Sequence, residues 1–75
     1  MKYVNGQSVR INNLESTTNV LPCSPSQKKL LWSAGTVTGI PKAGFYTVKD
    51  TSTQKHYIWH EDSLESDLIK MNFSP

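Results

Sequence analysis

The strongest constraint on the fold is the alternation of aromatic and β-branched runs with turn signals between residues 32 and 65. Residues 41–44, Pro-Lys-Ala-Gly, are typical of one turn, and the polar residues 50–54 of another. Residues 45–49 and 55–59 are rich in Tyr, Trp, Val and Ile, which favour strands. Because the runs are short and follow one another closely, the sequence predicts antiparallel strands wound into a very small barrel, an all-β fold.

Two further strands are predicted before this meander. In residues 8–11, Val9 and Ile11 alternate with polar side chains, as a half-buried strand requires. Residues 29–40 also have strand character. Two glycines within this second run indicate a bulge or a sharp bend, which a small barrel needs in order to close.

Residues 12–28 interrupt the strands with a stretch rich in Ser, Thr, Asn and Pro. Pro22 and Pro25 remove backbone donors and fix φ, so we expect a long irregular loop. Loops of this length are either functional or disordered, and we favour an ordered loop folded over the barrel. Towards the C-terminus we expect a short helical turn over residues 60–66. Residues 67–73 are predicted to form a last strand or, alternatively, a short terminal helix.

Seventy-five residues are enough for one domain, residues 1–75, with a small core. The single cysteine, Cys23, allows no internal disulfide, and no Cys/His pair has metal-ligand spacing. Stability must then come from close packing or from self-association, and we expect no metal or other cofactor. No apolar run follows Met1 or approaches the roughly 20 residues of a membrane span, which favours a cytoplasmic protein.

Charge is unevenly distributed along the chain. Residues 1–60 contain seven Lys and Arg residues against two acids, Glu15 and Asp50, whereas residues 61–75 contain four acids and one lysine. The body is therefore basic and the C-terminal segment acidic. One interpretation of this asymmetry is a basic face for an anionic partner. The alternative is charge that only keeps the protein soluble, which explains the same residue counts equally well.

Tyr57 and Trp59 are the most informative aromatic residues. They are two positions apart, so both side chains leave one face of their strand and Ile58 leaves the other. If Ile58 points inward with Tyr46 and Val48, the pair is exposed as a platform for stacking bases or for protein contact. If the pair instead fills the core, its role is structural.

The candidate partner-binding residues combine this pair with other aromatic and basic side chains. Lys49 and Lys55 flank one turn, and phosphate binding requires several such lysines on one surface. The chain has one arginine, so bidentate reading of bases is poorly supported and we expect little sequence specificity. The predicted residues for binding nucleic acid or a partner are Trp32, Lys42, Lys49, Lys55, Tyr57 and Trp59.

His60, Glu61 and Asp62 are the nearest approach to a catalytic cluster. Adjacent residues diverge in space, and no nucleophile or second ligand set has a suitable spacing. Acids in the first turn of a helix are explained by the helix dipole. We therefore predict no catalytic residues and no enzyme.

The predicted order is strand, long loop, three consecutive strands, a one-turn helix and a final strand. Over residues 5–70 this order resembles SH3-like barrels, and the resemblance implies a five-stranded SH3-like barrel. Because that fold hosts many unrelated functions, it implies an architecture and not an activity.

Residues 56–59, His-Tyr-Ile-Trp, precede a Leu-Glu pair at residues 64–65. This arrangement is similar to type II dihydrofolate reductases, tetramers of SH3-like barrels whose Val-Gln-Ile-Tyr strand lines a central pore ahead of a Leu-Glu. Ile58 matches, whereas Tyr57 and Trp59 replace the glutamine and the tyrosine. The resemblance therefore implies a shared fold and not shared folate or nicotinamide binding.

The segments Val-Arg-Ile at residues 9–11, Trp-Ser-Ala-Gly-Thr-Val at 32–37 and Tyr-Thr-Val at 46–48 form a second pattern. It resembles the C-terminal barrels of retroelement integrases, and the resemblance implies binding to DNA backbone or to protein partners. Glu61 and Asp62 stand where those barrels are typically basic.

We thus expect a noncatalytic interaction module, in the style of a small accessory protein of a phage or mobile element. The first hypothesis is nucleic-acid binding through the basic and aromatic residues. The alternative is a protein-binding module or inhibitor of a host protein, using the loop 12–28 and the acidic edge 61–67. A third hypothesis, a homo-oligomeric reductase-type enzyme, requires a tetramer and folate-dependent activity.

Overall fold

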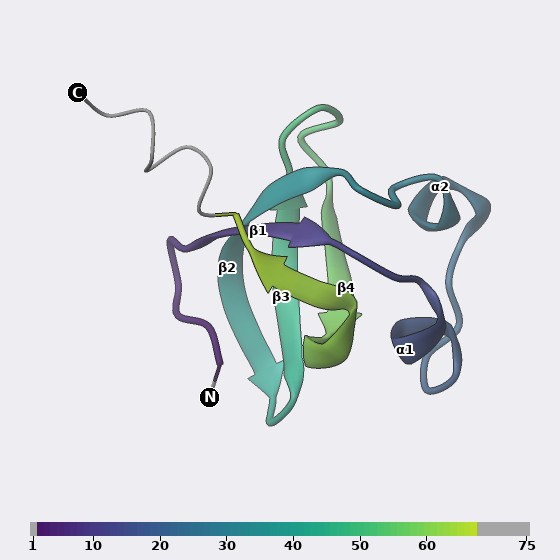
Figure 1. The fold of residues 1–75 in the computed structure, drawn as a ribbon, viewed down its shortest axis with the longest axis horizontal. Coiled ribbons are helices and arrows are strands. Elements are labelled where there is room, and N and C mark those ends of the chain that lie inside the picture. Colours follow the sequence, from purple (N-terminus) through teal and green to yellow (C-terminus); the bar gives the residue numbers. More distant parts are fainter. Residues whose placement is uncertain (1, 68–75) are drawn as a thin grey trace.

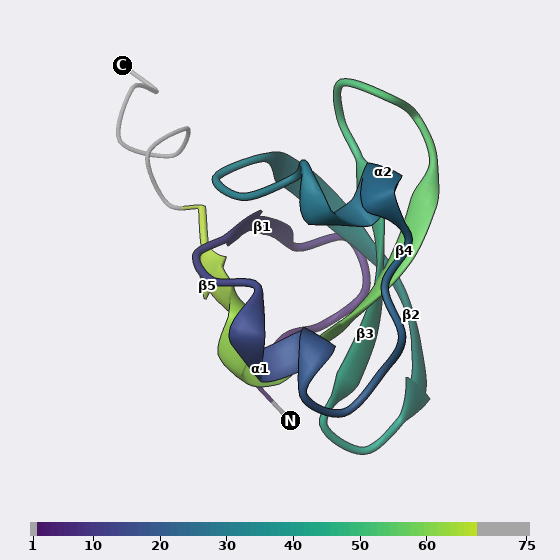
Figure 2. The same cartoon turned by 90° about the vertical axis from the view of Figure 1, so that its right-hand side faces the viewer.

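The computed structural model describes residues 2–67, which form a five-stranded antiparallel sheet in the order β4-β3-β2-β1-β5 (Figures 1 and 2). The strands are β1 Ser8–Ile11, β2 Ala34–Lys42, β3 Phe45–Asp50, β4 His56–His60 and β5 Leu64–Ser66. The helices are single turns: α1 Glu15–Thr18, α2 Pro25–Lys28 and the 3-10 turn η1 Glu61–Ser63. The predominance of strands confirms the all-β class. Within residues 2–67, none of these helices has the length and apolar character needed to cross a membrane.

Strand β2 runs through the middle of the sheet and pairs with β1 on one side and β3 on the other. Gly35 lies opposite Val9 of β1, and a Cβ there would stand 2.6 Å from Val48 Cγ1 and 2.7 Å from the Lys49 carbonyl oxygen. Only glycine allows the strands to approach this closely. Register shifts on both sides of Gly39 mark an irregularity in β2, which agrees with the bulge or bend expected from its glycines.

The core consists of the inward-facing side chains of the strands, together with Tyr3 and Leu30. The hydroxyl groups of the two buried tyrosines are both hydrogen-bonded. The Tyr46 hydroxyl accepts from the backbone N–H of Tyr3 at 3.2 Å, and the Tyr3 hydroxyl donates to the Leu64 carbonyl at 2.8 Å. Burial raises the pKa of Tyr3, so its phenol remains a donor. The buried hydrophobic residues are Tyr3, Val9, Ile11, Leu30, Val37, Tyr46, Val48, Trp59 and Leu64.

Residues 12–28 fold over the outer edge of β4 and contain two helical turns, so the prediction of an irregular loop holds only in part. Thr17, which is fully buried, accepts from the His60 backbone N–H at 2.9 Å and bonds the Ser63 hydroxyl at 2.7 Å. Gln27 Nε2 donates to the Ile58 carbonyl at 2.9 Å. These bonds satisfy backbone groups that an edge strand would otherwise leave unpaired.

The second half of the chain differs from the sequence prediction at its boundaries. The one-turn helix is present, but it covers only Glu61–Ser63, and Leu64–Ser66 forms β5 because it pairs with β1. The strand predicted at residues 67–73 lies outside the described residues except for Asp67, which is not in a strand. Strand β2 begins at Ala34, later than predicted, because residues 29–33 form the end of α2 and a turn.

Candidate functional site

The structure turns both residues of the predicted aromatic pair towards the core. Trp59 is 1% exposed and lies opposite Tyr46 in the core, and Tyr57 is half-buried against the core, whereas Ile58 is 41% exposed. The alternative in which the pair faces inward is therefore correct, and the expectation of an exposed Trp59 is wrong. The physical reason is that the larger side chains fill the core side of β4, where they remove more apolar surface from water.

The opposite side of β3 and β4, here called the outer face, carries basic and aromatic side chains. Cross-strand pairs place Lys49 opposite His56 and Phe45 opposite both Lys42 and His60. Asp50 is the only acidic residue of β2, β3 and β4, and it is 1% exposed. The outer face therefore presents positive charge without a competing carboxylate from these strands. It comprises Thr36, Lys42, Phe45, Thr47, Lys49, His56, Ile58 and His60.

One end of the outer face has an apolar hollow beside Phe45. Lys42 Nζ lies 4.9 Å from the centre of the Phe45 ring, within the range of a cation–π contact, and the His60 ring meets Phe45 edge-on at 5.2 Å. The hollow has a volume of about 160 Å³. This Phe45 pocket is lined by Leu21, Pro41, Lys42, Phe45 and Ile58.

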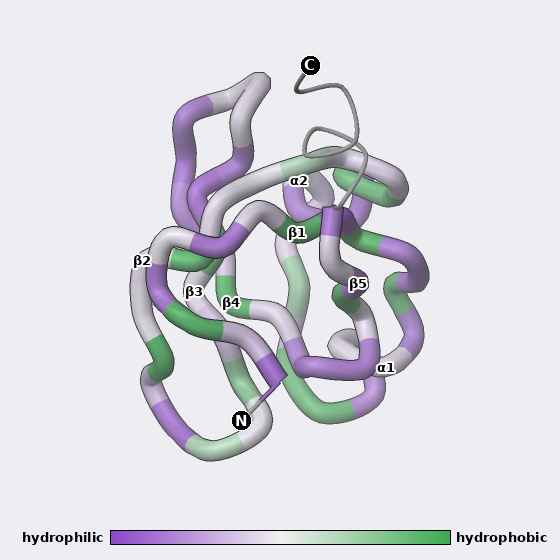
Figure 3. Tube along the Cα trace, turned by 60° about the vertical axis from the view of Figure 1, so that its left-hand side comes forward, coloured by the Kyte–Doolittle hydropathy of each residue, from purple (hydrophilic) through white to green (hydrophobic). Residues whose placement is uncertain are grey.

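The other end of the outer face, beside the β3–β4 hairpin, has a polar hollow of about 300 Å³. Figure 3 shows that this hairpin is mostly hydrophilic where it extends from the sheet. Lys49 is the cation of the hollow, which places a positive charge at this end as Lys42 does at the other. The lining residues are Thr36, Lys49, Asp50, Thr51 and Gln54.

Asp50 shapes this hairpin from within. Its Oδ2 accepts from the backbone N–H of Ser52 and of Thr53, each at 3.1 Å, and from the Ser52 hydroxyl at 2.7 Å. Burial by itself would raise the pKa of Asp50, but the Ser52 and Ser33 side chains and these backbone donors outweigh it and lower the pKa. Asp50 therefore acts as an ionised anchor of the turn and not as a surface acid.

Trp32 is 57% exposed and has a positive φ of 69°. Hydrogen bonds hold this conformation: the Trp32 N–H donates to the Ile11 carbonyl at 2.7 Å, and Arg10 Nη1 donates to the Trp32 carbonyl at 2.9 Å. The Thr51 N–H donates to the Ala34 carbonyl at 3.0 Å, which ties the hairpin to the start of β2. Trp32 thus stands near the hairpin end of the sheet.

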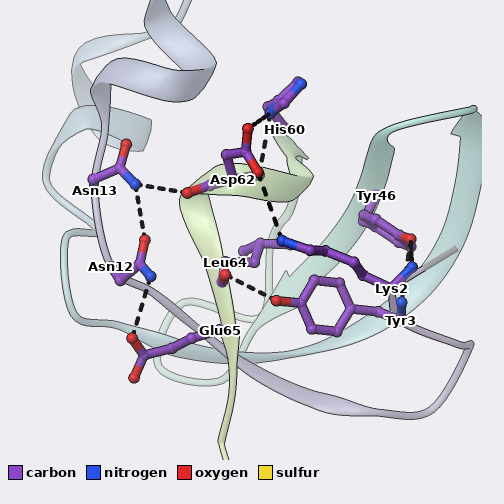
Figure 4. Close-up of polar contacts among 9 residues, drawn as sticks. All are labelled: Lys2, Tyr3, Asn12, Asn13, Tyr46, His60, Asp62, Leu64 and Glu65. Atoms are coloured by element: carbon purple, nitrogen blue, oxygen red, sulfur yellow. Dashed lines mark hydrogen bonds and ion pairs between the residues drawn. The ribbon is translucent and has the colours of Figure 1, made fainter.

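The acidic edge 61–67 is largely engaged in contacts within the protein (Figure 4). Asp62 pairs with Lys2 Nζ at 3.6 Å, and Glu65 Oε1 accepts from Asn12 Nδ2 at 3.2 Å. The Asp67 side chain is buried and pairs with Arg10 at 3.4 Å. These acids lie on η1 and β5 or just beyond them, and Asp62 also lies 3.8 Å from Nδ1 of His60, so the acidic edge reaches the outer face at His60.

The predicted site residues are thus only partly brought together. Lys42 and Lys49 share the outer face, Lys55 is exposed just before β4, Trp32 is exposed near the hairpin end of the sheet, and Trp59 lies in the core. Of the residues that line the Phe45 pocket, sequence reasoning selected only Lys42 as a binding residue. Alternation along β3 was the available signal for Phe45, because it shares a face with Lys49. For Leu21 and Pro41 no such signal exists, since their meeting with Phe45 depends on the path of residues 12–28.

Among residues 2–67, no group of His, Cys, Asp and Glu side chains is arranged to hold a metal ion. Comparisons with known proteins gave no match: no family model, no curated protein and no solved structure is significantly similar to the chain.

Proposed function

We propose that this protein is a noncatalytic nucleic-acid-binding module built on an SH3-like barrel. The fold proposal is supported by the strand order β4-β3-β2-β1-β5 and by the single 3-10 turn between β4 and β5. Residues 12–28, which span the edge of β4, occupy the position of the long first loop in that fold.

The observation that carries the function is the composition of the outer face. Lys42 and Lys49 stand at its two ends, Phe45 lies beside Lys42, and β2, β3 and β4 add no exposed carboxylate. Lysines on one surface neutralise phosphates, and an aromatic ring offers a stacking partner to any base. The interface binds the backbone and has little sequence specificity, because it lacks a bidentate arginine.

Two flanking residues extend this interface towards the hairpin. Lys55 adds a third cation, and the exposed indole of Trp32 adds a second aromatic surface. Tyr57 is half-buried, so its contribution is limited to the part of the ring that remains accessible. Trp59 supports the interface from the core and does not contact the ligand.

The geometry favours this function over protein binding through the acidic edge. Asp62, Glu65 and Asp67 each have a partner within the protein, so a basic ligand would have to compete with existing contacts. Lys49 and Lys55 have no ion pair within residues 2–67 and are available to an anion.

The first prediction concerns the salt dependence of oligonucleotide binding. With three lysines contacting phosphates, log K should fall against log salt with a slope of about −2 to −3, so affinity drops roughly 16- to 64-fold between about 50 and 200 mM salt. Lys42→Gln and Lys49→Gln should each weaken binding and reduce the slope by about 1. The measurement is the fluorescence anisotropy of a labelled oligonucleotide of mixed sequence.

Lys2→Gln is the control, because Lys2 is an exposed lysine that pairs with Asp62 and is not itself a residue of the outer face. It should leave both affinity and slope nearly unchanged. Absence of binding by the unmodified protein at about 50 mM salt, where electrostatic attraction is strong, would exclude the proposed function. Equal losses in all three lysine variants would assign the effect to net charge instead of this face.

A further inference from the structure

We infer that the Phe45 pocket receives one unstacked base, so that the ligand of the proposed interface is a single-stranded nucleic acid. This inference rests on the proposed function and adds to it the class of nucleic acid and the position at which a base is held.

The size of the pocket suits a single flat ring. Its volume of about 160 Å³ lies below the roughly 300–1,000 Å³ of sites for drug-sized ligands. Leu21, Pro41 and Ile58 supply apolar walls, and Phe45 supplies an aromatic surface. Every base has a π-face that packs on such a ring whatever its sequence, which agrees with an interface of low specificity.

The charge at the pocket favours a nucleotide over an apolar side chain of a protein. Lys42 Nζ stands 4.9 Å from the Phe45 ring centre and lines the same hollow, so a cation borders an apolar cavity. A nucleotide presents the complementary pair of groups, a flat ring joined to an anionic phosphate. An apolar protein side chain would fill the walls and leave Lys42 without a matching charge.

The position of the pocket favours an unpaired strand. Its walls come from β2, β3, β4 and Leu21 of the covering segment, so a ring that lies on Phe45 contacts protein on several sides while the hollow stays open to solvent. In a duplex each base is stacked between its neighbours and paired, and it reaches such a site only by leaving the stack. A single strand presents its bases without that cost.

The test compares three labelled ligands at about 50 mM salt: a thymidine oligomer of about twelve nucleotides, an abasic strand with the same number of phosphates, and a duplex of the same length. We expect the thymidine strand to bind roughly tenfold more tightly than the abasic strand, within the range found for one stacked base. The duplex should bind no more tightly than the abasic strand, because its phosphates reach the lysines while its bases stay stacked.

Ile58→Ser and Phe45→Leu should lower the ratio of thymidine to abasic affinity severalfold, mainly by weakening thymidine binding, to the part that stacking on Trp32 supplies. Ile58 is 41% exposed, so its replacement leaves the core intact, and Phe45→Leu keeps an apolar side chain while removing the ring. Val20→Ser is the matched control, since Val20 is 54% exposed and does not line the pocket. This variant should keep the full ratio.

The outcomes separate the two proposals. Equal binding of the thymidine and abasic strands would overturn the pocket assignment and leave phosphate binding intact, with an apolar protein side chain as the remaining occupant. Tighter binding of the duplex, or an unchanged ratio in both pocket variants, would also overturn it. Binding of none of the three ligands would overturn the proposed function, and this inference with it.

Discussion

At the scale of single residues, the backbone of Trp32 has a φ of 69°, a conformation that residues other than glycine rarely adopt. Such strain persists where the surroundings enforce it, here through hydrogen bonds to Ile11 and Arg10 of β1. An exposed indole on a strained backbone makes Trp32 the second aromatic contact of the proposed interface.

The strain at Trp32 is measurable by comparing two truncations. Trp32→Gly and Trp32→Ala both remove the indole, but only alanine keeps the steric cost of a positive φ. We expect Trp32→Gly to be more stable than Trp32→Ala by about 1 kcal/mol in urea unfolding. An alanine variant as stable as the glycine variant would show that the backbone there is relaxed.

Asp50 gives a pH-dependent prediction. Its pKa is lowered in the fold below the ordinary value of about 3.9, so its contribution to stability is complete above that pH and is lost as pH falls through the folded pKa. At pH 7, Asp50→Asn should lower the free energy of unfolding by about 1–3 kcal/mol, because a neutral amide oxygen accepts these three bonds more weakly than a carboxylate and the amide NH2 takes the buried place of Oδ1.

The difference between the original protein and Asp50→Asn should shrink when urea unfolding is repeated at progressively lower pH below about 4. Asp62→Asn serves as the control, because Asp62 is exposed and its ion pair contributes at most about 1 kcal/mol. A deficit in Asp50→Asn that stays constant with pH would contradict an ionised anchor.

Sequence reasoning at this scale identified which residues share a face but not which face is buried. The alternation of Tyr57, Ile58 and Trp59 has a period of two, and that period is satisfied equally by either side facing the core. The choice depends on what stands opposite on β3, where Tyr46 is buried opposite Trp59. The pairing between strands therefore decides which face is buried, and a single sequence does not show how the strands pair.

At the scale of elements, the two glycines of β2 differ in how much space their surroundings leave for a side chain. A Cβ added at Gly35 would clash with its neighbours, since Val48 Cγ1 and the Lys49 carbonyl oxygen lie within 2.7 Å of where that Cβ would stand. At Gly39 the nearest atom, Thr47 Cβ, lies at an ordinary 3.7 Å. Gly35→Ala should therefore destabilise the protein by about 1–3 kcal/mol, whereas Gly39→Ala should be neutral or stabilise it by up to about 1 kcal/mol.

Thermal or urea unfolding of the two glycine variants tests this assignment directly. Similar losses at both positions would mean that the cost reflects flexibility along β2 and not the close approach of β2 to β3.

Elements with strong local signals were predicted well. Strand β1 and the turns of the meander are encoded by alternation and by Pro, Gly and polar residues, and their observed bounds agree within a residue or two. The helical turns α1 and α2 were missed because each is one turn long, too short for any periodic pattern. β5 was missed because Leu64–Ser66 is extended only through its pairing with β1.

At the scale of the whole molecule, the covering segment 12–28 and the sheet share hydrogen bonds through Thr17 and Gln27, on both sides of Trp59 in β4. We therefore expect one cooperative unfolding transition. In a Trp32→Phe variant, Trp59 is the only tryptophan, and its fluorescence should change at the same urea concentration as far-UV circular dichroism. Separate midpoints would show that the segment detaches before the sheet unfolds.

The cover over β4 also has a consequence for how the protein behaves in concentrated solution. β4 reads His-Tyr-Ile-Trp-His, an aromatic edge strand without Lys, Asp, Glu or Pro, and such edges are templates for intermolecular pairing and fibril growth. The protein blocks this template with the side chains of Thr17 and Gln27 instead of with charge. We therefore expect aggregation of the protein to depend more on how rarely these two side chains leave β4 than on its net charge of +2.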